Sequence, residues 1–190
     1  MRLFIAINLP DEWKETLSKP MESIAWIAKG VHWVEPKGMH LTLKFLGDVE
    51  REQMDALSNL LKPIADTSPG FNVRIAGTGA FPSPRRPRVF WAGISAPEEL
   101  VHLQHRIDEA TQSLGFPAED REFKPHLTVA RIKEPLGKKR ITDAFLRFKI
   151  RSEPFHVECF SLMRSHLRSD GARYEELVNF PLAPDSALTR

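Results

Sequence analysis

The chain has 190 residues, of which 42% are hydrophobic and 27% charged, and its 27 Lys and Arg residues nearly balance its 25 Asp and Glu residues. This composition excludes an intrinsically disordered chain and suffices for a packed core. The length suits one domain, or two small lobes that share an interface. The net charge of +2 is compatible with an anionic ligand, whereas a protein that coats long nucleic acid would carry more positive charge.

The cysteine content and the apolar runs indicate the cellular environment. Cys159 is the only cysteine, so the chain cannot form an internal disulfide, as is typical of the reducing cytoplasm. No apolar run approaches the roughly 18 residues of a membrane span, and residues 3–9 are too few for the core of a signal peptide. We therefore expect a cytoplasmic protein with no membrane partner. Since the sequence indicates no protein partner, we expect a monomer.

The first half of the chain alternates strands and helices. From apolar periodicity and capping residues we expect a strand at residues 3–8, a helix at 11–29, a loop at 33–38, a strand at 39–46, a helix at 51–65 and a strand at 71–75. Pro20 lacks a backbone N–H and should kink or divide the first helix. Residues 77–87 are rich in Gly, Pro and Arg, and their prolines should keep them out of a central sheet.

The second half repeats this order of elements. We expect a strand at residues 88–95, a helix at 98–114, a strand at 125–132, a helix at 138–148 and a hairpin of strands 155–167 and 174–182 around Asp170-Gly171. The predicted fold class is α+β, with two pseudo-symmetric lobes. Each lobe would be an antiparallel-rich sheet with helices on its outer face, and the active-site cleft would lie between them. Residues 1–183 would form this single bilobal domain, and residues 184–190 a C-terminal tail.

A tetrapeptide of His, apolar, Thr, apolar occurs twice, as His40-Leu41-Thr42-Leu43 and His126-Leu127-Thr128-Val129. The two copies are 86 residues apart, and residues 2–6 match residues 88–92 at the same offset. Residues 71–73 resemble residues 155–157 at an offset of 84. A shared offset over separate strands indicates two structurally similar halves, as a duplication would produce.

The alternation of side chains along a strand predicts what each motif presents. Leu41, Leu43 and Phe45 would face a core, while His40, Thr42 and Lys44 would face a groove. The second copy would likewise present His126 and Thr128. Two imidazoles suit a general acid and a general base on opposite sides of a phosphorus atom, and two hydroxyls can donate to its non-bridging oxygens. The motifs carry no acidic residue, which argues against a metal centre.

With these motifs the chain resembles the two-histidine phosphoesterase superfamily, and within it the RNA 2′,3′-cyclic phosphodiesterases, also called 2′-5′ RNA ligases. The matching segments are Arg2-Leu-Phe-Ile-Ala-Ile, His40-Leu-Thr-Leu-Lys-Phe-Leu-Gly47, residues 82–93, Phe123-Lys-Pro-His-Leu-Thr-Val-Ala-Arg131 and residues 165–182. The resemblance implies a bilobal fold, no cofactor, and hydrolysis of RNA ends or nucleotides carrying a 2′,3′-cyclic phosphate to 2′-phosphomonoesters. It implies His40 as general acid, His126 as general base, and Thr42 and Thr128 as phosphate ligands. The reverse reaction would join RNA through a 2′-5′ bond.

Further candidates lie beside the motifs. The resemblance favours a phosphate contact for Arg131, although strict alternation turns it away from the groove unless a bulge intervenes. Lys44 could steer RNA or simply be solvated. Bases could stack on an aromatic residue, and upstream phosphates could meet the Arg-rich loop; the candidates are Trp33, Phe81, Phe123, Arg85 and Arg86. His102 and His105 have a metal-ligand spacing but no third ligand.

Three other functions fit the same motifs. The chain could hydrolyse small cyclic nucleotides or 2′-5′ oligonucleotides, which differ from RNA ends in size and linkage. It could also bind a nucleotide or an RNA end without turnover. The two intact histidines favour an enzyme over such a binding module, and the basic loop at residues 77–87 favours longer RNA.

Overall fold

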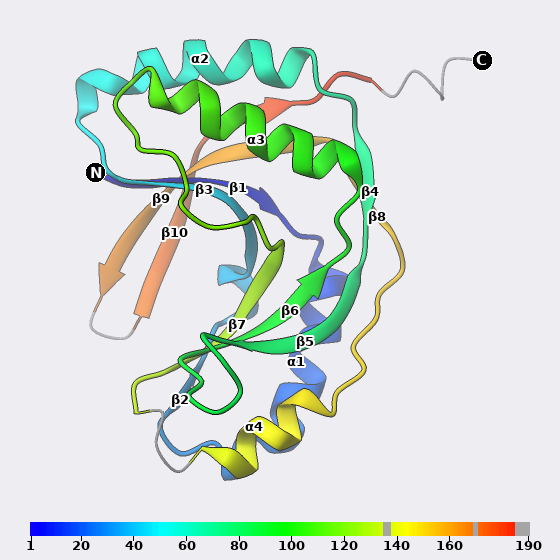
Figure 1. Cartoon of the computed structure of the whole chain (residues 1–190). Coiled ribbons are helices and arrows are strands. Elements are labelled where there is room, and N and C mark those ends of the chain that lie inside the picture. Colours follow the sequence, from blue (N-terminus) through cyan, green and yellow to red (C-terminus); the bar gives the residue numbers. More distant parts are fainter. Residues whose placement is uncertain (135–137, 169–170, 185–190) are drawn as a thin grey trace.

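The computed structural model describes residues 1–134, 138–168 and 171–184, which form an α+β fold (Figure 1). The α-helices are α1 (Asp11–Ile24), α2 (Met54–Asp66), α3 (Glu98–Gln112) and α4 (Lys139–Leu146). The strands are β1 (Arg2–Asn8), β2 (Val31–Trp33), β3 (His40–Asp48), β4 (Phe71–Val73), β5 (Ile75–Phe81), β6 (Val89–Ile94), β7 (His126–Ile132), β8 (Phe155–Val157), β9 (Cys159–Arg168) and β10 (Gly171–Pro181). Short 3-10 helices are η1 (Ala25–Ile27), η2 (Pro36–Gly38) and η3 (Arg51–Gln53).

The sheet is antiparallel and continuous across both halves of the chain. Its strand order is β10-β9-β1-β3-β7-β6-β5, with β2 also paired to β7. We call β10, β9, β1 and β3 the first half-sheet, and β7, β6, β5 and β2 the second half-sheet. The two half-sheets meet where β3 pairs with β7 at Leu41 and Leu127. The predicted sheets of two lobes are therefore joined edge to edge at the motif strands.

Strand pairing reveals a pseudo-two-fold relation between the halves. Leu41 pairs with Leu127, its counterpart at the offset of 86 residues. Asn72 pairs with His156 between β4 and β8, at the offset of 84. Two equivalent residues can pair antiparallel only if a local two-fold axis passes between them, so the repeat seen in the sequence is a repeat in the fold.

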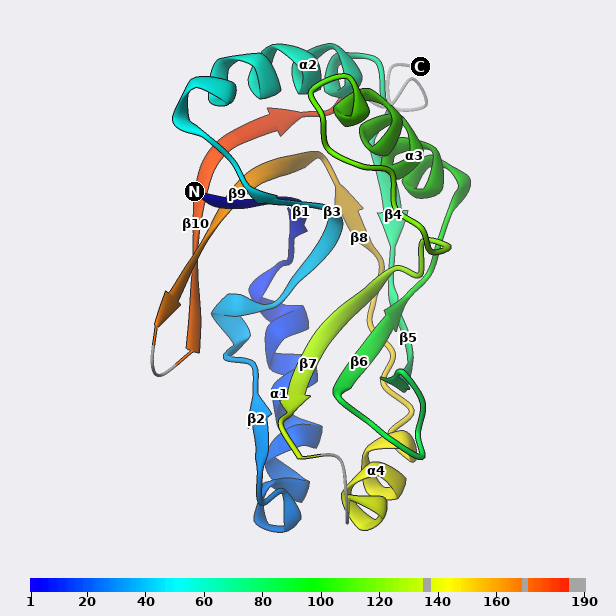
Figure 2. The ribbon, with the colours of Figure 1, turned by 60° about the vertical axis from the view of Figure 1, so that its left-hand side comes forward.

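Each half-sheet takes strands from both halves of the chain. β1 pairs with β9 of the second half, and β6 pairs with β5 of the first half. The helices are shared in the same way, because α2 packs on α3 and α1 packs on α4. Figures 1 and 2 show α2 and α3 together at one end of the molecule and α1 and α4 at the other. The sequence halves are thus interleaved rather than stacked as two separate units.

Several predicted elements need correction. The first helix ends at Ile24 instead of residue 29, and residues 31–33 form β2, which the sequence did not predict. Of the segment whose prolines should keep it out of a central sheet, residues 77–81 belong to the edge strand β5, because its prolines begin only at Pro82. Strand pairing also corrects the alignment of β1 with β6. Phe4 opposes Phe45, and Val89 opposes Arg131, which is the counterpart of Phe45 in the second motif strand. Phe4 therefore corresponds to Val89, at an offset of 85 residues instead of 86.

The C-terminal hairpin is confirmed. β9 and β10 pair from Arg168 and Gly171 to Cys159 and Pro181. Of its predicted turn, Asp170 lies outside the described residues, as do residues 185–190 of the predicted tail. No helix in the described part of the chain is both long and apolar enough to cross a membrane.

Candidate active site

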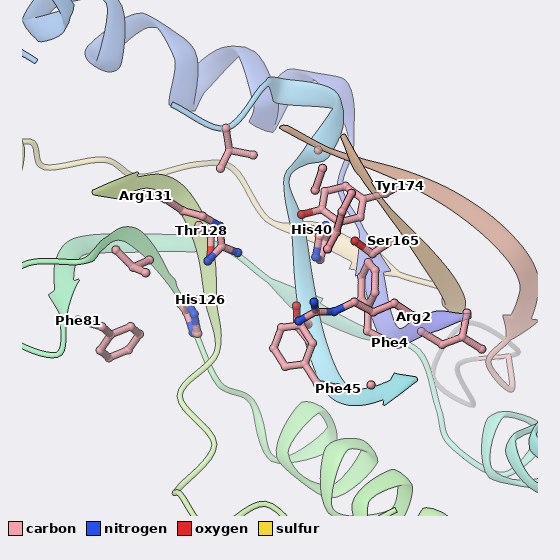
Figure 3. A pocket seen from close by; sticks show the side chains of 18 residues that line it. Arg2, Phe4, His40, Phe45, Phe81, His126, Thr128, Arg131, Ser165 and Tyr174 are labelled. Carbon is pink, nitrogen blue, oxygen red and sulfur yellow. The ribbon is translucent and has the colours of Figure 1, made fainter. Parts of the chain in front are cut away.

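Both His-x-Thr motifs line one pocket of about 420 Å³. Figure 3 shows His40 and His126 entering it from different strands, with Thr128 and Arg131 on the strand of His126. The lining residues come from seven strands of the sheet and the segments next to them: Arg2, Leu3, Phe4, Val34, Gly38, His40, Thr42, Phe45, Gly47, Phe81, Val89, His126, Thr128, Arg131, Ser165, Leu167, Ala172 and Tyr174. The structure therefore brings together the four motif residues that the sequence predicted to act together.

Each motif strand contains a bulge at the fourth motif residue. On β3, Thr42 opposes Ala6 and Lys44 opposes Ile5, which leaves Leu43 without an opposing residue. On β7, Thr128 opposes Trp91 and Ala130 opposes Phe90, so Val129 is the extra residue there. A bulge reverses the alternation of side chains beyond it. The two strands therefore have the same order of buried and exposed residues over seven positions.

The carbonyl at each bulge has a hydrogen-bond donor from another element. The buried side-chain amide of Gln104 donates to the Leu43 carbonyl at 3.4 Å. The backbone N–H of Val34 donates to the Val129 carbonyl at 2.9 Å. A buried carbonyl without a hydrogen-bond donor would raise the free energy of the folded protein. Because both carbonyls have a donor, these contacts stabilise both bulges.

The bulges decide which residue follows Thr into the pocket. Arg131 lines it, as predicted for the case that a bulge intervenes. Phe45, its counterpart on β3, also lines it and is 61% exposed, so the prediction that Phe45 faces the core is wrong. One motif strand therefore adds a guanidinium to the pocket, and the other adds an exposed aromatic ring.

Lys44 is the largest correction among the site predictions. Its side chain was expected on the groove face, but it is 2% exposed, because the bulge turns it into the protein. Its ammonium group donates to the Asp108 carboxylate of α3 and to the carbonyl of Pro117. The same carboxylate accepts the backbone N–H of Glu119 at 3.2 Å. Lys44 thus ties β3 to α3 and to the segment that leads into β7, and it cannot contact RNA from there.

The His126 ring is oriented by the backbone. Its Nδ1 lies 2.6 Å from the carbonyl oxygen of Lys124. A carbonyl only accepts, so Nδ1 carries a hydrogen and Nε2 is the nitrogen left for proton transfer. Phe81 packs edge-on against the ring at 5.0 Å between centroids. Burial lowers the pKa of His126, the hydrogen bond to Lys124 opposes that shift, and the Arg131 charge adds to it.

His40 lies in a tighter aromatic setting. Its ring centroid is 4.6 Å from that of Phe4 and 4.8 Å from that of Tyr174. Burial lowers the pKa of His40 from 6.5 to about 4, opposed by a hydrogen bond to the Gly38 backbone and assisted by the Arg131 charge. In both motifs the backbone partner lies two residues before the histidine, so the two halves orient their imidazoles in the same way.

The charge of Arg131 reaches both histidines, since it lowers the pKa of each. With both imidazoles neutral near pH 7, this guanidinium is a positive charge close to both of them. A phosphate bound there would accept from Arg131 and from the hydroxyls of Thr42 and Thr128, and its negative charge would raise the pKa of both histidines. The arrangement can therefore bind a phosphodiester and transfer protons on two sides of it.

Of the other residues predicted to contact RNA, some line the pocket and some lie elsewhere. Phe81 lines the pocket, whereas Phe123 lines a separate pocket of about 630 Å³ beside α3. Trp33 packs toward Phe145 in the core, at 6.4 Å between centroids, instead of toward the site. Arg85 and Arg86 are exposed in the turn that follows Phe81. Their contacts with RNA stay predictions.

The pocket also contains residues that sequence reasoning missed. Arg2 and Phe4 come from β1, and Ser165 and Tyr174 from the C-terminal hairpin (Figure 3). Their strands were predicted, but strand patterns do not show which distant strands become neighbours. His102 and His105 are exposed on α3, and no group of three or more potential metal ligands occurs within the described ranges.

Comparison with known proteins gives consistent matches. The family model of LigT-like phosphoesterases matches residues 7–91 and again residues 93–174, one match for each half. The RNA 2′,3′-cyclic phosphodiesterase of Archaeoglobus fulgidus is 36% identical over 183 residues, which cover 95% of this chain and 99% of that protein. The protein of the same name from Methanothermobacter thermautotrophicus is 31% identical, with coverage of 96% and 99%.

Solved structures extend the match to the fold. The crystal structure of TT0787 from Thermus thermophilus superposes with a TM-score of 0.82 at 31% identity, covering 97% of this chain and 99% of that one. Escherichia coli LigT in complex with 3′-AMP gives a TM-score of 0.71 at 29% identity, with coverage of 95% and 97%. These matches run over almost the whole length of the chain.

Proposed function

This chain belongs to the LigT-like phosphoesterase family, and on that premise we propose that it hydrolyses 2′,3′-cyclic phosphates at RNA ends to 2′-phosphomonoesters, without a metal ion. The observation that carries the proposal is the meeting of both His-x-Thr motifs and Arg131 in one pocket. The names of the full-length relatives supply the substrate class. The binding of 3′-AMP by Escherichia coli LigT supports a nucleotide ligand.

The chemical step needs one base and one acid. His126 Nε2 takes a proton from water as the water oxygen attacks phosphorus. The bond from phosphorus to O3′ breaks, and His40 gives its proton to the departing O3′. Arg131, Thr42 and Thr128 donate to the non-bridging oxygens, where negative charge grows. The choice of His40 as the acid follows the family resemblance, because both rings are oriented alike by their own backbone.

The low pKa of His40 has a consequence for this mechanism. An imidazole with a pKa of about 4 is neutral at pH 7 and has no proton to give. The substrate's phosphate is an anion, and its arrival beside the ring favours the protonated form. We therefore infer that His40 gains its proton together with the substrate, so that the acid is assembled only in the complex.

The remaining functional inferences rest on the same pocket. The two half-sheets act as two lobes of one unit, residues 1–183, because neither contains both histidines. A 5′-hydroxyl in place of water would reverse the reaction and form a 2′-5′ bond. Phe81, which packs against His126, and Arg85 and Arg86, in the turn that follows Phe81, are proposed RNA contacts. We keep a cytoplasmic monomer as our expectation.

The test is turnover of a short RNA that ends in a 2′,3′-cyclic phosphate, with EDTA present. We expect steady hydrolysis, and none with the same RNA ending in a 2′-phosphate. Inhibition by EDTA would overturn the metal-free mechanism. Tight binding of the cyclic RNA without turnover would instead make the protein a binding module. Faster turnover of cyclic mononucleotides than of RNA would favour the small-nucleotide alternative.

A further inference from the structure

An exposed tryptophan lies outside the pocket. Among the described residues, three large hydrophobic side chains are strongly exposed: Phe45, Leu167 and Trp26. Phe45 and Leu167, exposed by 61% and 69%, both line the pocket. Trp26 is 75% exposed and belongs to η1, just before β2. The exposure of Phe45 and Leu167 is thus explained by the pocket, and that of Trp26 needs a different explanation.

Trp26 lies at the far end of the strand that carries His126. Val31, at the start of β2, pairs with Ile132, at the end of β7. His126 is six residues earlier on β7, which corresponds to roughly 20 Å along a strand. Figure 2 shows the start of β2, the end of β7 and α4 together at this end of the molecule. An RNA chain that leaves the pocket along β7 would therefore run toward the end of the molecule where the segment of Trp26 lies.

One cation stacks on Trp26, and others lie in the segments next to it. The guanidinium of Arg140, in the first turn of α4, lies 5.1 Å from the centroid of the Trp26 ring. The ammonium group of Lys138 donates to the carbonyl of Lys29, which fixes the start of α4 against the turn after η1. We call Trp26, Lys29, Lys133, Lys138 and Arg140 the basic tip. A stacked Arg on an exposed indole combines an aromatic face with a phosphate donor.

The charge balance of this end favours an anion. Residues 22–33 and 132–143 contain five Lys and Arg residues against three acidic ones, Glu22, Glu134 and Asp143. Asp143 pairs with Lys139 at 2.5 Å, one turn along α4. Among the described residues, no ion pair involves the cations of the basic tip. Their charge is not offset by close acidic partners and is free to attract phosphates.

Positive charge also accompanies the path from the pocket. Arg131 lines the pocket, and Lys133 follows it at the end of β7. Arg88, on the neighbouring strand segment, accepts a hydrogen bond from the Ile132 backbone through its own carbonyl at 2.9 Å. Its exposed side chain therefore starts beside the end of β7. Cations thus flank β7 between the cyclic phosphate site and the basic tip.

We propose that the basic tip binds the RNA upstream of the cyclic end, with a base stacked on Trp26 and backbone phosphates on Arg140 and Lys138. This inference rests on the proposed function, since it takes the cyclic end to lie between His40 and His126. Stacking on an aromatic side chain tolerates any base, and the phosphate contacts read no sequence. The tip therefore selects RNA by length: it strengthens binding of a chain that reaches it and leaves a mononucleotide unaffected.

The experiment compares two substrates, a 2′,3′-cyclic mononucleotide and a ten-nucleotide RNA with a cyclic end. For Trp26→Ala we expect kcat/KM on the RNA to fall about tenfold, mainly through KM, as loss of one stacked base predicts. Arg140→Gln should reduce it less and weaken its dependence on salt. Both variants should hydrolyse the mononucleotide at the wild-type rate. Trp26→Phe should restore most of the RNA activity, and Arg74→Gln, an exposed arginine on another surface, is the matched control.

The outcomes separate this inference from the proposed function. Equal rates of wild type and Trp26→Ala on the RNA would overturn the basic tip as an RNA site. An equal loss on both substrates would also overturn it, because the change would then act on the pocket. If wild type hydrolyses neither substrate, the proposed function fails, and fluorescence anisotropy of the labelled RNA still tests the tip. Binding to Trp26→Ala as tight as to wild type would then contradict it.

Discussion

The two motif strands are alike in backbone and different in chemistry. β3 and β7 share their bulge, their order of buried and exposed positions and the backbone hydrogen bond to each histidine. Beyond the bulge, β3 has Lys44 and Phe45 where β7 has Ala130 and Arg131. The duplicated fold thus supplies two histidines in equivalent backbone positions. The different residues at the two positions after each bulge give these histidines different surroundings. One strand places its cation in the pocket, and the other places it behind the pocket in an ion pair.

Removing either histidine should have the largest effect. For His40→Ala and for His126→Ala we expect turnover to fall by about 10²–10⁴, the usual contribution of a general acid or base. A substrate with a p-nitrophenolate leaving group sharpens the comparison, because such a group departs without a proton. It should restore activity to His40→Ala far more than to His126→Ala. The opposite pattern would exchange their roles.

Lys44→Met should be the most damaging change to stability. It leaves the Asp108 carboxylate without its buried cation, which typically costs about 3 kcal/mol. Urea unfolding measures this loss, and Lys44→Met combined with Asp108→Leu should recover much of it. An exposed ion pair such as Lys62 with Asp66 provides the control, since Lys62→Met should change stability by less than about 0.5 kcal/mol. Equal effects of the two single variants would contradict the account of Lys44.

Arg131→Met tests the cation that β7 places in the pocket. Loss of a charge-assisted contact should weaken phosphate binding by roughly 10- to 100-fold. Because the Arg131 charge lowers the pKa of both His40 and His126, its removal should raise both values. NMR titration of the two imidazoles measures these shifts. Unchanged titration of both rings would show that Arg131 lies too far from them to act as described.

The burial of His40 should also make the stability of the protein depend on pH. Its pKa is lowered to about 4, so between pH 6.5 and 4 the unfolded chain binds more protons than the folded protein. Stability should therefore fall as the pH falls through this window, by up to about 3 kcal/mol from this residue. His40→Gln removes that contribution, and its unfolding free energy should fall less over the same range. Parallel curves for variant and wild type would contradict the burial of His40.

Much of this fold could be predicted from local sequence. Alternating apolar residues and caps located most strands and helices, and the repeated tetrapeptide predicted that His40 and His126 share a site. The prediction failed where an irregular backbone intervenes. Strict alternation of side chains predicted Lys44 in the groove and Phe45 in the core, and the bulge on β3 reverses both positions. No residue pattern in this sequence indicates that bulge.

Long-range pairing accounts for the other errors. Residues 31–33 form a strand only because the end of β7 offers an unpaired edge, and an offset of 86 residues does not reveal that β5 and β9 cross to the opposite half-sheet. Phe4 and Tyr174 reach His40 from opposite ends of the chain. Their contribution to the pocket is a property of the assembled sheet, which local patterns do not contain.

The most direct test of the central claim is phosphorus NMR of the product that wild-type protein forms from a short RNA with a 2′,3′-cyclic end. The account predicts a 2′-phosphomonoester as the sole product, in EDTA, because O3′ must leave with the proton of His40. A 3′-phosphomonoester would contradict it, because the bond to O2′ would then be the one that breaks. Absence of any product would contradict the catalytic role of both histidines.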